Sequence, residues 1–192
     1  NVCENSPRIA RMNFVNAELT KLATNTYVST KITFGNMLAK FCELIPGAHV
    51  DTVTSALGMD NRIGGKYLKG GMAYGGPCLV RDNLALSAYA RANGNRAQLS
   101  ESTDMANRSE TDRLVALIKR ERNEDGIVGI LGLSYKPGTD VIDSSPGIIL
   151  AKALLGQGIP VRAYDPAAMF QARKVLGDSP VFTKSAEACI QE

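Results

Sequence analysis

The spacing of apolar residues between Asn16 and Ile45 predicts one long helix. Proline is absent from this stretch, and apolar side chains recur at steps of three and four residues, at Leu19, Leu22, Ala23, Ile32, Met37, Leu38 and Phe41. We expect Asn16 to cap the amino end and Pro46-Gly47 to stop the helix. About thirty residues at ~1.5 Å each span about 45 Å. A helix of that length favours a domain interface or a dimer seam.

The next part of the chain alternates between helical patterning and glycine. We expect a short helix over 51–57, a loop over 58–76, a helix over 81–92, and a polar but helix-compatible stretch over 97–122. Seven of the nineteen residues of that loop are glycine, which indicates unusual backbone requirements. The sequence therefore predicts an all-helical part up to residue 122.

After Asn123 the pattern changes to short apolar strands separated by helices. Residues 127–133 are almost continuously apolar, as expected of a strand buried on both faces. Strands over 160–164 and 181–183 and helices over 146–155, 167–175 and 185–190 follow. Such alternation predicts a parallel, doubly wound sheet, and the fold class is α/β overall.

Both ends of the chain suggest a longer polypeptide. A parallel sheet of three strands, with its last strand close to the final residue, is thin for a doubly wound fold. The long helix follows the first residues almost directly. We therefore expect a fragment, with a truncated α/β domain.

Composition and charge exclude several classes of protein. Hydrophobic residues make up 44% and charged residues 21%, which is ordinary globular composition. The net charge of +3 is too small to indicate nucleic-acid binding. The longest apolar run, residues 127–133, is too short to cross a bilayer, and residues 1–11 lack the pattern of a signal peptide. We expect a cytoplasmic protein without nucleic-acid or membrane partners.

The cysteines indicate neither a disulfide framework nor a metal site. Cys3, Cys42, Cys78 and Cys189 are far apart, and none forms a CxxC pair. The single histidine, His49, has no ligand partner at metal spacing. We predict reduced thiols and no bound metal.

Cys78 is the cysteine with a chemically suggestive setting. Gly75-Gly76-Pro77 precede it, and a helix that begins here would place the thiol at an amino end, where a thiolate is stabilised. Asp82 lies one turn further on the same face, so the pair could serve as nucleophile and proton acceptor. The alternative is a cysteine that only packs before a helix.

Two further groups of residues are candidates for binding. Lys21 and Asn25 lie one turn apart on the long helix and could hold an oxyanion or a sugar hydroxyl, although a solvated face is the ordinary interpretation. The cations and glycines of residues 61–70 suit a diphosphate.

Tyr135 and Lys136 follow the first predicted strand, at the edge where open α/β sheets bind ligands. No GxGxxG is present, so Asp165 at the end of the second strand is not assigned to a dinucleotide. This domain is expected to bind something smaller than NAD, or to bind NAD differently.

Four segments together resemble the UDP-glucose/GDP-mannose dehydrogenase family. They are the long-helix segment 17–27 (AELTKLATNTY), the segment 60–68 (DNRIGGKYL), the segment 75–82 (GGPCLVRD) and the segment 132–140 (GLSYKPGTD). They occur in the family's order over roughly residues 12–190. The resemblance implies a central helical dimerisation domain at 12–122 and a truncated, Rossmann-like UDP-sugar-binding domain at 123–192.

The activity that this resemblance implies is oxidation of the C6 alcohol of a UDP- or GDP-hexose to the uronic acid, with two NAD+ and one water. Cys78 would carry the thiohemiacetal and thioester, Lys21 and Asn25 would stabilise the oxyanion, and Asp82 would activate water. The matching substrate contacts are Tyr27, Arg62, Tyr67, Gly75, Tyr135 and Lys136. Among them, Tyr135 would lie against the base, and Arg62 would reach a neighbouring subunit.

The chain also departs from the family. Arg81 replaces a lysine and is assigned to the cofactor, and Asp143 stands where the family often has arginine. The family's N-terminal NAD-binding domain is absent from these residues. We therefore expect a homodimer through the long helix that binds sugar nucleotide but is inactive alone. The alternative is a non-catalytic sugar-nucleotide-binding or dimerisation module derived from the family.

Overall fold

The computed structural model describes residues 8–191, so Cys3 and most of the segment considered for a signal peptide lie outside the described residues. The helical part consists of α1 (Phe14–Leu44), α2 (Val50–Gly58), α3 (Leu79–Ala92) and α4 (Gln98–Glu121). The predicted helices are confirmed, with ends that differ by one or two residues. The predicted cap is wrong: Asn13 caps α1, because its side chain accepts the Asn16 N–H at 2.9 Å.

The second part is the predicted parallel α/β unit. It contains β1 (Val128–Leu131), α5 (Pro146–Leu155), β2 (Val161–Tyr164), α6 (Met169–Leu176), β3 (Val181–Phe182) and α7 (Ala186–Ile190). The strand order is β1-β2-β3, all parallel, with Val128 opposite Val161 and Arg162 opposite Val181. The α/β fold class is confirmed.

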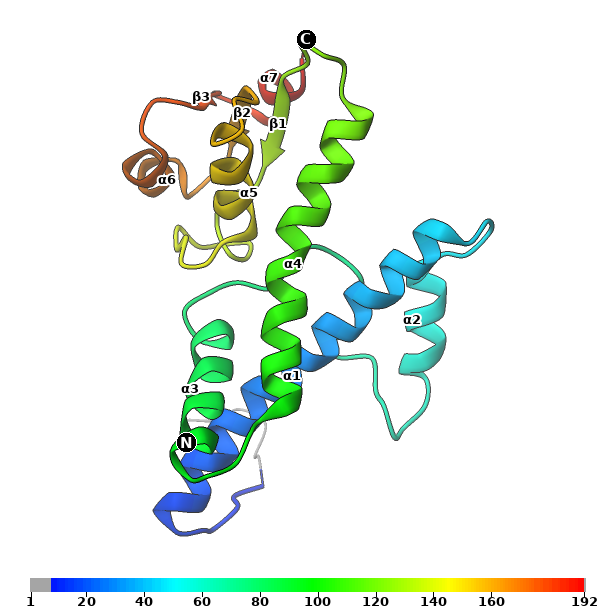
Figure 1. The fold of residues 1–192 in the computed structure, drawn as a ribbon, viewed down its shortest axis with the longest axis vertical. Coiled ribbons are helices and arrows are strands. Elements are labelled where there is room, and N and C mark those ends of the chain that lie inside the picture. The colour runs from blue at the N-terminus through cyan, green and yellow to red at the C-terminus, as the bar shows by residue number, and fades with distance from the viewer. Residues whose placement is uncertain (1–7, 192) are drawn as a thin grey trace.

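Helix α4 joins the two parts (Figure 1). Its first turns pack on α1 and α3, whereas its last turns lie beside α5. Val115 belongs to the apolar core of the α/β unit, together with Ile130, Leu133, Ile148, Leu150, Ala151, Leu154, Ile159, Val161, Ala163, Ala168, Ala172 and Leu176. One rigid helix therefore sets the position of the helical part relative to the sheet.

The interior of the helical part is mostly polar. Its buried side chains include Ser29, Asn36, Asn83, Ser87, Ser100, Thr103, Asn107 and Glu110. Helix α1 buries Thr26, Ser29, Gly35 and Asn36, while several of its apolar side chains face solvent. Gly35 lets the backbone of Lys69 pass close to α1, because a Cβ at position 35 would lie 2.6 Å from the Lys69 carbonyl oxygen. Periodicity therefore predicts this helix but not the face that the fold buries.

Among residues 8–191, no helix combines the length and the hydropathy that crossing a bilayer requires.

Candidate active site

Asp82 is the centre of a polar cluster between α1 and α3. Its Oδ2 accepts hydrogen bonds from Asn25 Nδ2 at 2.6 Å and from Lys21 Nζ at 3.1 Å, and its Oδ1 accepts from Arg81 Nε at 3.1 Å. The Asp82 side chain is 5% exposed, whereas that of Lys21 is 63% exposed. The fold thus brings together the two residue pairs that the sequence spacing suggested separately.

The cluster keeps Asp82 ionised. Burial opposes the charged form, but hydrogen bonds from Asn25, Lys21 and Arg81 outweigh it and hold the pKa of Asp82 below its usual value. Near neutral pH Asp82 is therefore ionised. Because Lys21 is largely exposed, its ammonium group can also bind a ligand oxygen.

Cys78 lies directly before α3, beside this cluster. It occupies the N-cap position, its side chain is exposed, and its carbonyl accepts the Asp82 N–H at 2.8 Å. Thiol and carboxylate therefore lie at the two ends of the first helical turn. Of the other described cysteines, Cys42 is half-buried and Cys189 is buried, with its Sγ 3.6 Å from the Ile130 carbonyl oxygen.

We predict that iodoacetamide at neutral pH alkylates Cys78 at least about tenfold faster than Cys42 or Cys189, because exposure and the amino end of a helix both favour thiolate attack. Peptide mass spectrometry at successive times measures each rate in the folded chain. Faster labelling of Cys42 would contradict the assignment of Cys78 as the nucleophile.

A buried cluster that the sequence did not indicate supports the turn after Cys78. Asn83 Nδ2 donates to the Leu79 carbonyl at 3.1 Å, to Ser29 Oγ at 2.5 Å and to the Tyr74 hydroxyl at 3.2 Å. Burial raises the pKa of Tyr74 to about 12, so this phenol remains neutral. The first turn of α3 is therefore tied both to α1 and to the segment that leads into Cys78.

A cavity of about 740 Å³ lies at the carboxyl ends of β1 and β2. Tyr135 and Lys136 line it, at the sheet edge where the sequence predicted ligand binding, and the Lys136 Nζ lies 5.4 Å from the centre of the Tyr135 ring. Met72 and Ala73 form part of the opposite wall. A cation, an aromatic ring and apolar walls suit a nucleotide.

The glycine segment before Cys78 packs on the α/β unit beside this cavity. The Gly76 N–H donates to the Asp143 carbonyl at 2.8 Å, and Gly76 has φ +87°, which favours glycine. A Cβ on Gly76 would lie 2.5 Å from the Tyr135 ring, and one on Gly75 would lie 2.1 Å from the Ser144 carbonyl oxygen. Residues 72–78 therefore run from the cavity wall to the thiol.

Three predicted substrate contacts lie elsewhere in the single chain. Tyr27 is exposed and lines a separate groove with Leu86 and Leu99. Arg62 is paired with Asp60 at 2.6 Å, and Tyr67 is exposed in the loop after α2, which lies away from α3 (Figure 1). The structure places Lys21, Asn25 and Arg81 on Asp82, one helical turn from Cys78. It packs Gly75 against Ser144 and Gly76 against the Tyr135 ring.

Asp165, directly after β2, is already hydrogen-bonded to backbone N–H groups. Asp165 Oδ2 accepts the N–H groups of Leu133 and Ser134, and its Oδ1 accepts those of Ala167 and Ala168. Despite burial, these bonds lower the pKa of Asp165 to about 2 and leave little capacity for a ribose hydroxyl. Within residues 8–191, no three potential metal-ligating side chains are grouped.

Comparison with family models identifies both parts of the chain. The central domain of the UDP-glucose/GDP-mannose dehydrogenase family matches residues 15–109, and the UDP binding domain of the same family matches residues 129–192. Each part therefore matches a domain of one family, in the same order.

Individual relatives agree with this result. The chain is 34% identical to UDP-glucose 6-dehydrogenase AglM of Haloferax volcanii over 95% of this chain and 43% of that protein. It is 32% identical to UDP-glucose 6-dehydrogenase TuaD of Bacillus subtilis over 96% of this chain and 40% of that protein. The chain thus spans about two fifths of the length of the curated relatives it matches.

Solved structures give the same picture. A UDP-glucose dehydrogenase from Pyrobaculum islandicum superposes with a TM-score of 0.85 at 34% identity, over 91% of this chain and 40% of that chain. A GDP-mannose dehydrogenase from Pseudomonas aeruginosa superposes with a TM-score of 0.59 at 26% identity, over 91% of this chain and 42% of that chain.

Proposed function

The chain belongs to the UDP-glucose/GDP-mannose dehydrogenase family, and we propose that it forms the substrate-binding and thiol-bearing part of a nucleotide-sugar 6-dehydrogenase. The observation that carries the proposal is the path of residues 72–78 from the cavity to Cys78. A nucleotide held by Tyr135 and Lys136 would direct its sugar along this path. The substrate is a UDP- or GDP-hexose, and the product is its uronic acid.

In the first covalent step that this chain can support, the Cys78 thiolate attacks the C6 aldehyde of the bound sugar. A C–S bond forms, and the carbonyl electron pair moves to oxygen. The N–H groups of Lys21 and Asn25 stabilise this oxyanion, as donors placed before the reaction do in acyl-transfer sites. Lys21 can do this while it remains paired with Asp82, because an ammonium group has three donors.

Hydrolysis of the thioester is the second step assigned to these residues. Water attacks the thioester carbon while Asp82 accepts one of its protons; the C–S bond then breaks, the Cys78 thiolate leaves and the uronic acid forms, which loses its remaining proton to solvent. The low pKa of Asp82 keeps it ionised for this role. The C6 alcohol must lose a hydride and its hydroxyl proton before the first step to become the aldehyde, and the thiohemiacetal oxyanion must lose a second hydride between the two steps.

The hydride acceptor in this proposal is NAD, bound by a part of the enzyme outside residues 1–192. The α/β unit does not fit NAD, because Asp165 is occupied by backbone N–H groups and no GxGxxG turn follows β1. Arg81, which pairs with Asp82, is the one cofactor contact that we assign to this chain. The isolated chain is therefore expected to form no NADH.

We predict that the isolated chain binds UDP-glucose or GDP-mannose with micromolar affinity and that Lys136→Met weakens binding by about tenfold or more, because a charge-assisted phosphate contact contributes roughly 1.5–3 kcal/mol. Lys152→Met on α5, also exposed, is the matched control and should bind like the parent. Calorimetry measures affinity, and absorbance of NADH tests activity. No heat with either sugar nucleotide would contradict the proposal, and NADH formation would contradict the placement of NAD outside these residues.

We also propose a homodimer along α1. Tyr27, Phe34 and Phe41 recur every seven residues, and Met37 and Leu44 follow the same spacing; all five are exposed in the single chain. Apolar side chains at this spacing form a seam between paired helices.

Light scattering at micromolar concentration is expected to give about twice the 20.5 kDa of one chain. The double variant Phe34→Glu/Phe41→Glu should be monomeric, whereas Phe170→Glu on α6, which is equally apolar and exposed, should remain dimeric. A monomeric parent would refute the dimer.

A further inference from the structure

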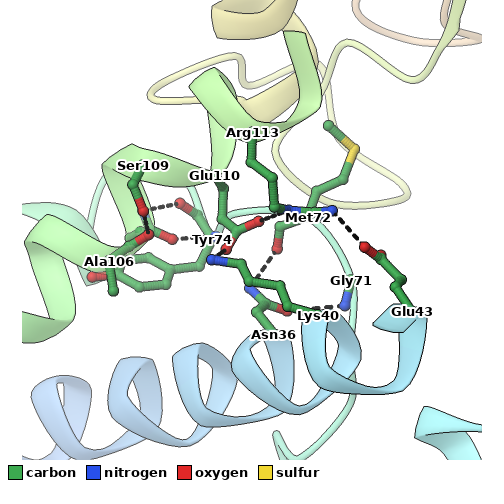
Figure 2. A network of polar contacts seen from close by, with 11 residues as sticks. Asn36, Lys40, Glu43, Gly71, Met72, Tyr74, Ala106, Ser109, Glu110 and Arg113 are labelled. Carbon is green, nitrogen blue, oxygen red and sulfur yellow. Dashed lines mark hydrogen bonds and ion pairs between the residues drawn. The ribbon is translucent and has the colours of Figure 1, made fainter. Parts of the chain in front are cut away.

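Two buried asparagines hold the backbone of residues 71–74 between α1 and α4; we call this pair, Asn36 and Asn107, the asparagine clamp. Asn36 accepts the Gly71 N–H and donates to the Met72 carbonyl, both at 2.9 Å (Figure 2). Asn107 accepts the Tyr74 N–H at 2.8 Å and donates to the Tyr74 carbonyl at 3.0 Å. Asn107 therefore pairs with both backbone groups of one residue, as an adjacent β-strand would, whereas Asn36 bridges Gly71 and Met72; together the two amides fix the register of the segment.

Both side chains of the clamp are buried and hydrogen-bonded. Asn36 is 3% exposed and Asn107 is 8% exposed, and both ends of each amide are bonded to the segment. A buried primary amide that pairs with two backbone groups is costly to replace by water, so the register is strongly specified.

An ion-pair network fixes the same helix crossing without bonding to the segment. Buried Glu110 pairs with Lys40 of α1 and accepts from Arg113 Nε at 3.0 Å (Figure 2). Arg113 also reaches Glu43 at 2.8 Å. Lys40 lies one turn from Asn36, and Glu110 one turn from Asn107. The chain thus separates two tasks: ion pairs join the helices, and the clamp holds residues 71–74.

The position of the segment matters for both ends of the proposed site. Met72, whose carbonyl accepts from Asn36, and the next residue, Ala73, line the cavity. Cys78 follows Tyr74 by four residues, with Gly75 and Gly76 already packed on the α/β unit. A shift of one residue would move the chain by ~3.3 Å and invert its side chains.

We infer that Asn36 and Asn107 are positioning residues that set the distance between the nucleotide cavity and the Cys78 thiol. This inference rests on the proposed function, because it assigns to the segment the task of placing the sugar carbon at sulfur. The clamp acts through the backbone of residues 71–74 and is not itself catalytic.

The first test needs no ligand. Asn36→Ala and Asn107→Ala are expected to slow iodoacetamide alkylation of Cys78 by about fivefold or more, because a displaced segment would pull Cys78 out of the N-cap position of α3. The double variant Lys40→Met/Glu110→Met is the matched control. It alters the same crossing of α1 and α4, but its Cys78 should be alkylated at the parental rate. Parental rates in both clamp variants, or equal slowing in the control, would overturn the inference.

The second test separates the clamp from general stability. UDP-glucose should protect Cys78 from alkylation in the parent, whereas UDP, which lacks the sugar, should not. In the clamp variants, UDP affinity by calorimetry should stay within about twofold of the parent while protection by UDP-glucose is lost. Protection that persists would overturn the inference.

If the parent binds neither UDP-glucose nor GDP-mannose, the proposed function fails, and the ligand-free alkylation rates still decide the role of the clamp. If a clamp variant does not fold, hydrogen exchange of the parent chain tests the inference instead. The Gly71 and Tyr74 amides should exchange as slowly as those in the middle of α1, and rapid exchange at both would overturn the inference.

Discussion

Replacing Gly75 by alanine is expected to destabilise the chain by about 3 kcal/mol, the upper part of the range for forcing an extra carbon into a packed interior. The new Cβ would lie 2.1 Å from the Ser144 carbonyl oxygen and 3.0 Å from Pro146 Cδ. Ser144 itself has φ +48°, so the opposing loop already occupies a restricted conformation and cannot easily yield. Urea unfolding at neutral pH measures the loss.

The same glycine-rich stretch supplies the control. A Cβ on Gly71 would meet nothing within 4 Å, so Gly71→Ala should change stability by less than about 1 kcal/mol and could increase it by restricting the unfolded chain. Similar midpoints for the parent and Gly75→Ala would show that the glycine segment does not pack on the α/β unit as the structure has it.

The second large effect is expected at Asp165. Asp165→Asn should lower the free energy of unfolding by about 2–3 kcal/mol at pH 7. The NH2 of the asparagine would face two backbone N–H donors that bond to a carboxylate oxygen in the parent chain. Oδ1 receives the Ala167 and Ala168 N–H groups, both at 2.8 Å, and Oδ2 receives that of Leu133 at 2.7 Å. Asp178→Asn on the surface should have little effect, since its pairing with Arg173 is exposed.

The contribution of Asp165 should also depend on pH in a defined direction. Its pKa is lowered from 3.8 to about 2 in the folded chain, so the folded state favours the ionised form. The stabilisation is therefore complete above about pH 5 and declines as pH falls from about 4 to 2. Urea unfolding of parent and Asp165→Asn across this range should show their difference shrinking. A difference that stays constant would indicate that the carboxylate charge is not what stabilises the loop.

Local patterns predicted the elements well because the helices and strands have regular periodicity and clear breakers. The buried face of α1 could not be predicted in this way. Its apolar side chains at Phe34, Met37 and Phe41 are exposed, while Ser29 and Asn36 are buried. Hydrophobic patterning identifies an apolar stripe but does not indicate whether the same chain or another molecule covers it.

The candidate site was predictable where its residues are close in sequence. Spacing alone related Cys78 to Asp82 and Lys21 to Asn25. The Asn25–Asp82 hydrogen bond, which connects the two pairs, joins residues that are 57 apart in the sequence and depends on how α1 packs against α3. The clamp could not be foreseen, because Asn36 and Asn107 bind backbone groups 33 to 36 residues away, and backbone groups carry no sequence pattern.

The contrast between the polar interior of the helical part and the apolar core around the sheet has a calorimetric consequence. Exposure of apolar surface raises the heat capacity on unfolding, by ~0.45 cal/mol/K per Å², whereas exposure of polar surface lowers it by ~0.26. Unfolding the helical part exposes Ser29, Asn83 and Asn107, whereas unfolding the α/β part exposes Leu133, Leu154 and Val161. We therefore expect the helical part to contribute less to the heat-capacity increase on unfolding, residue for residue, than the α/β part, with α4 contributing to both.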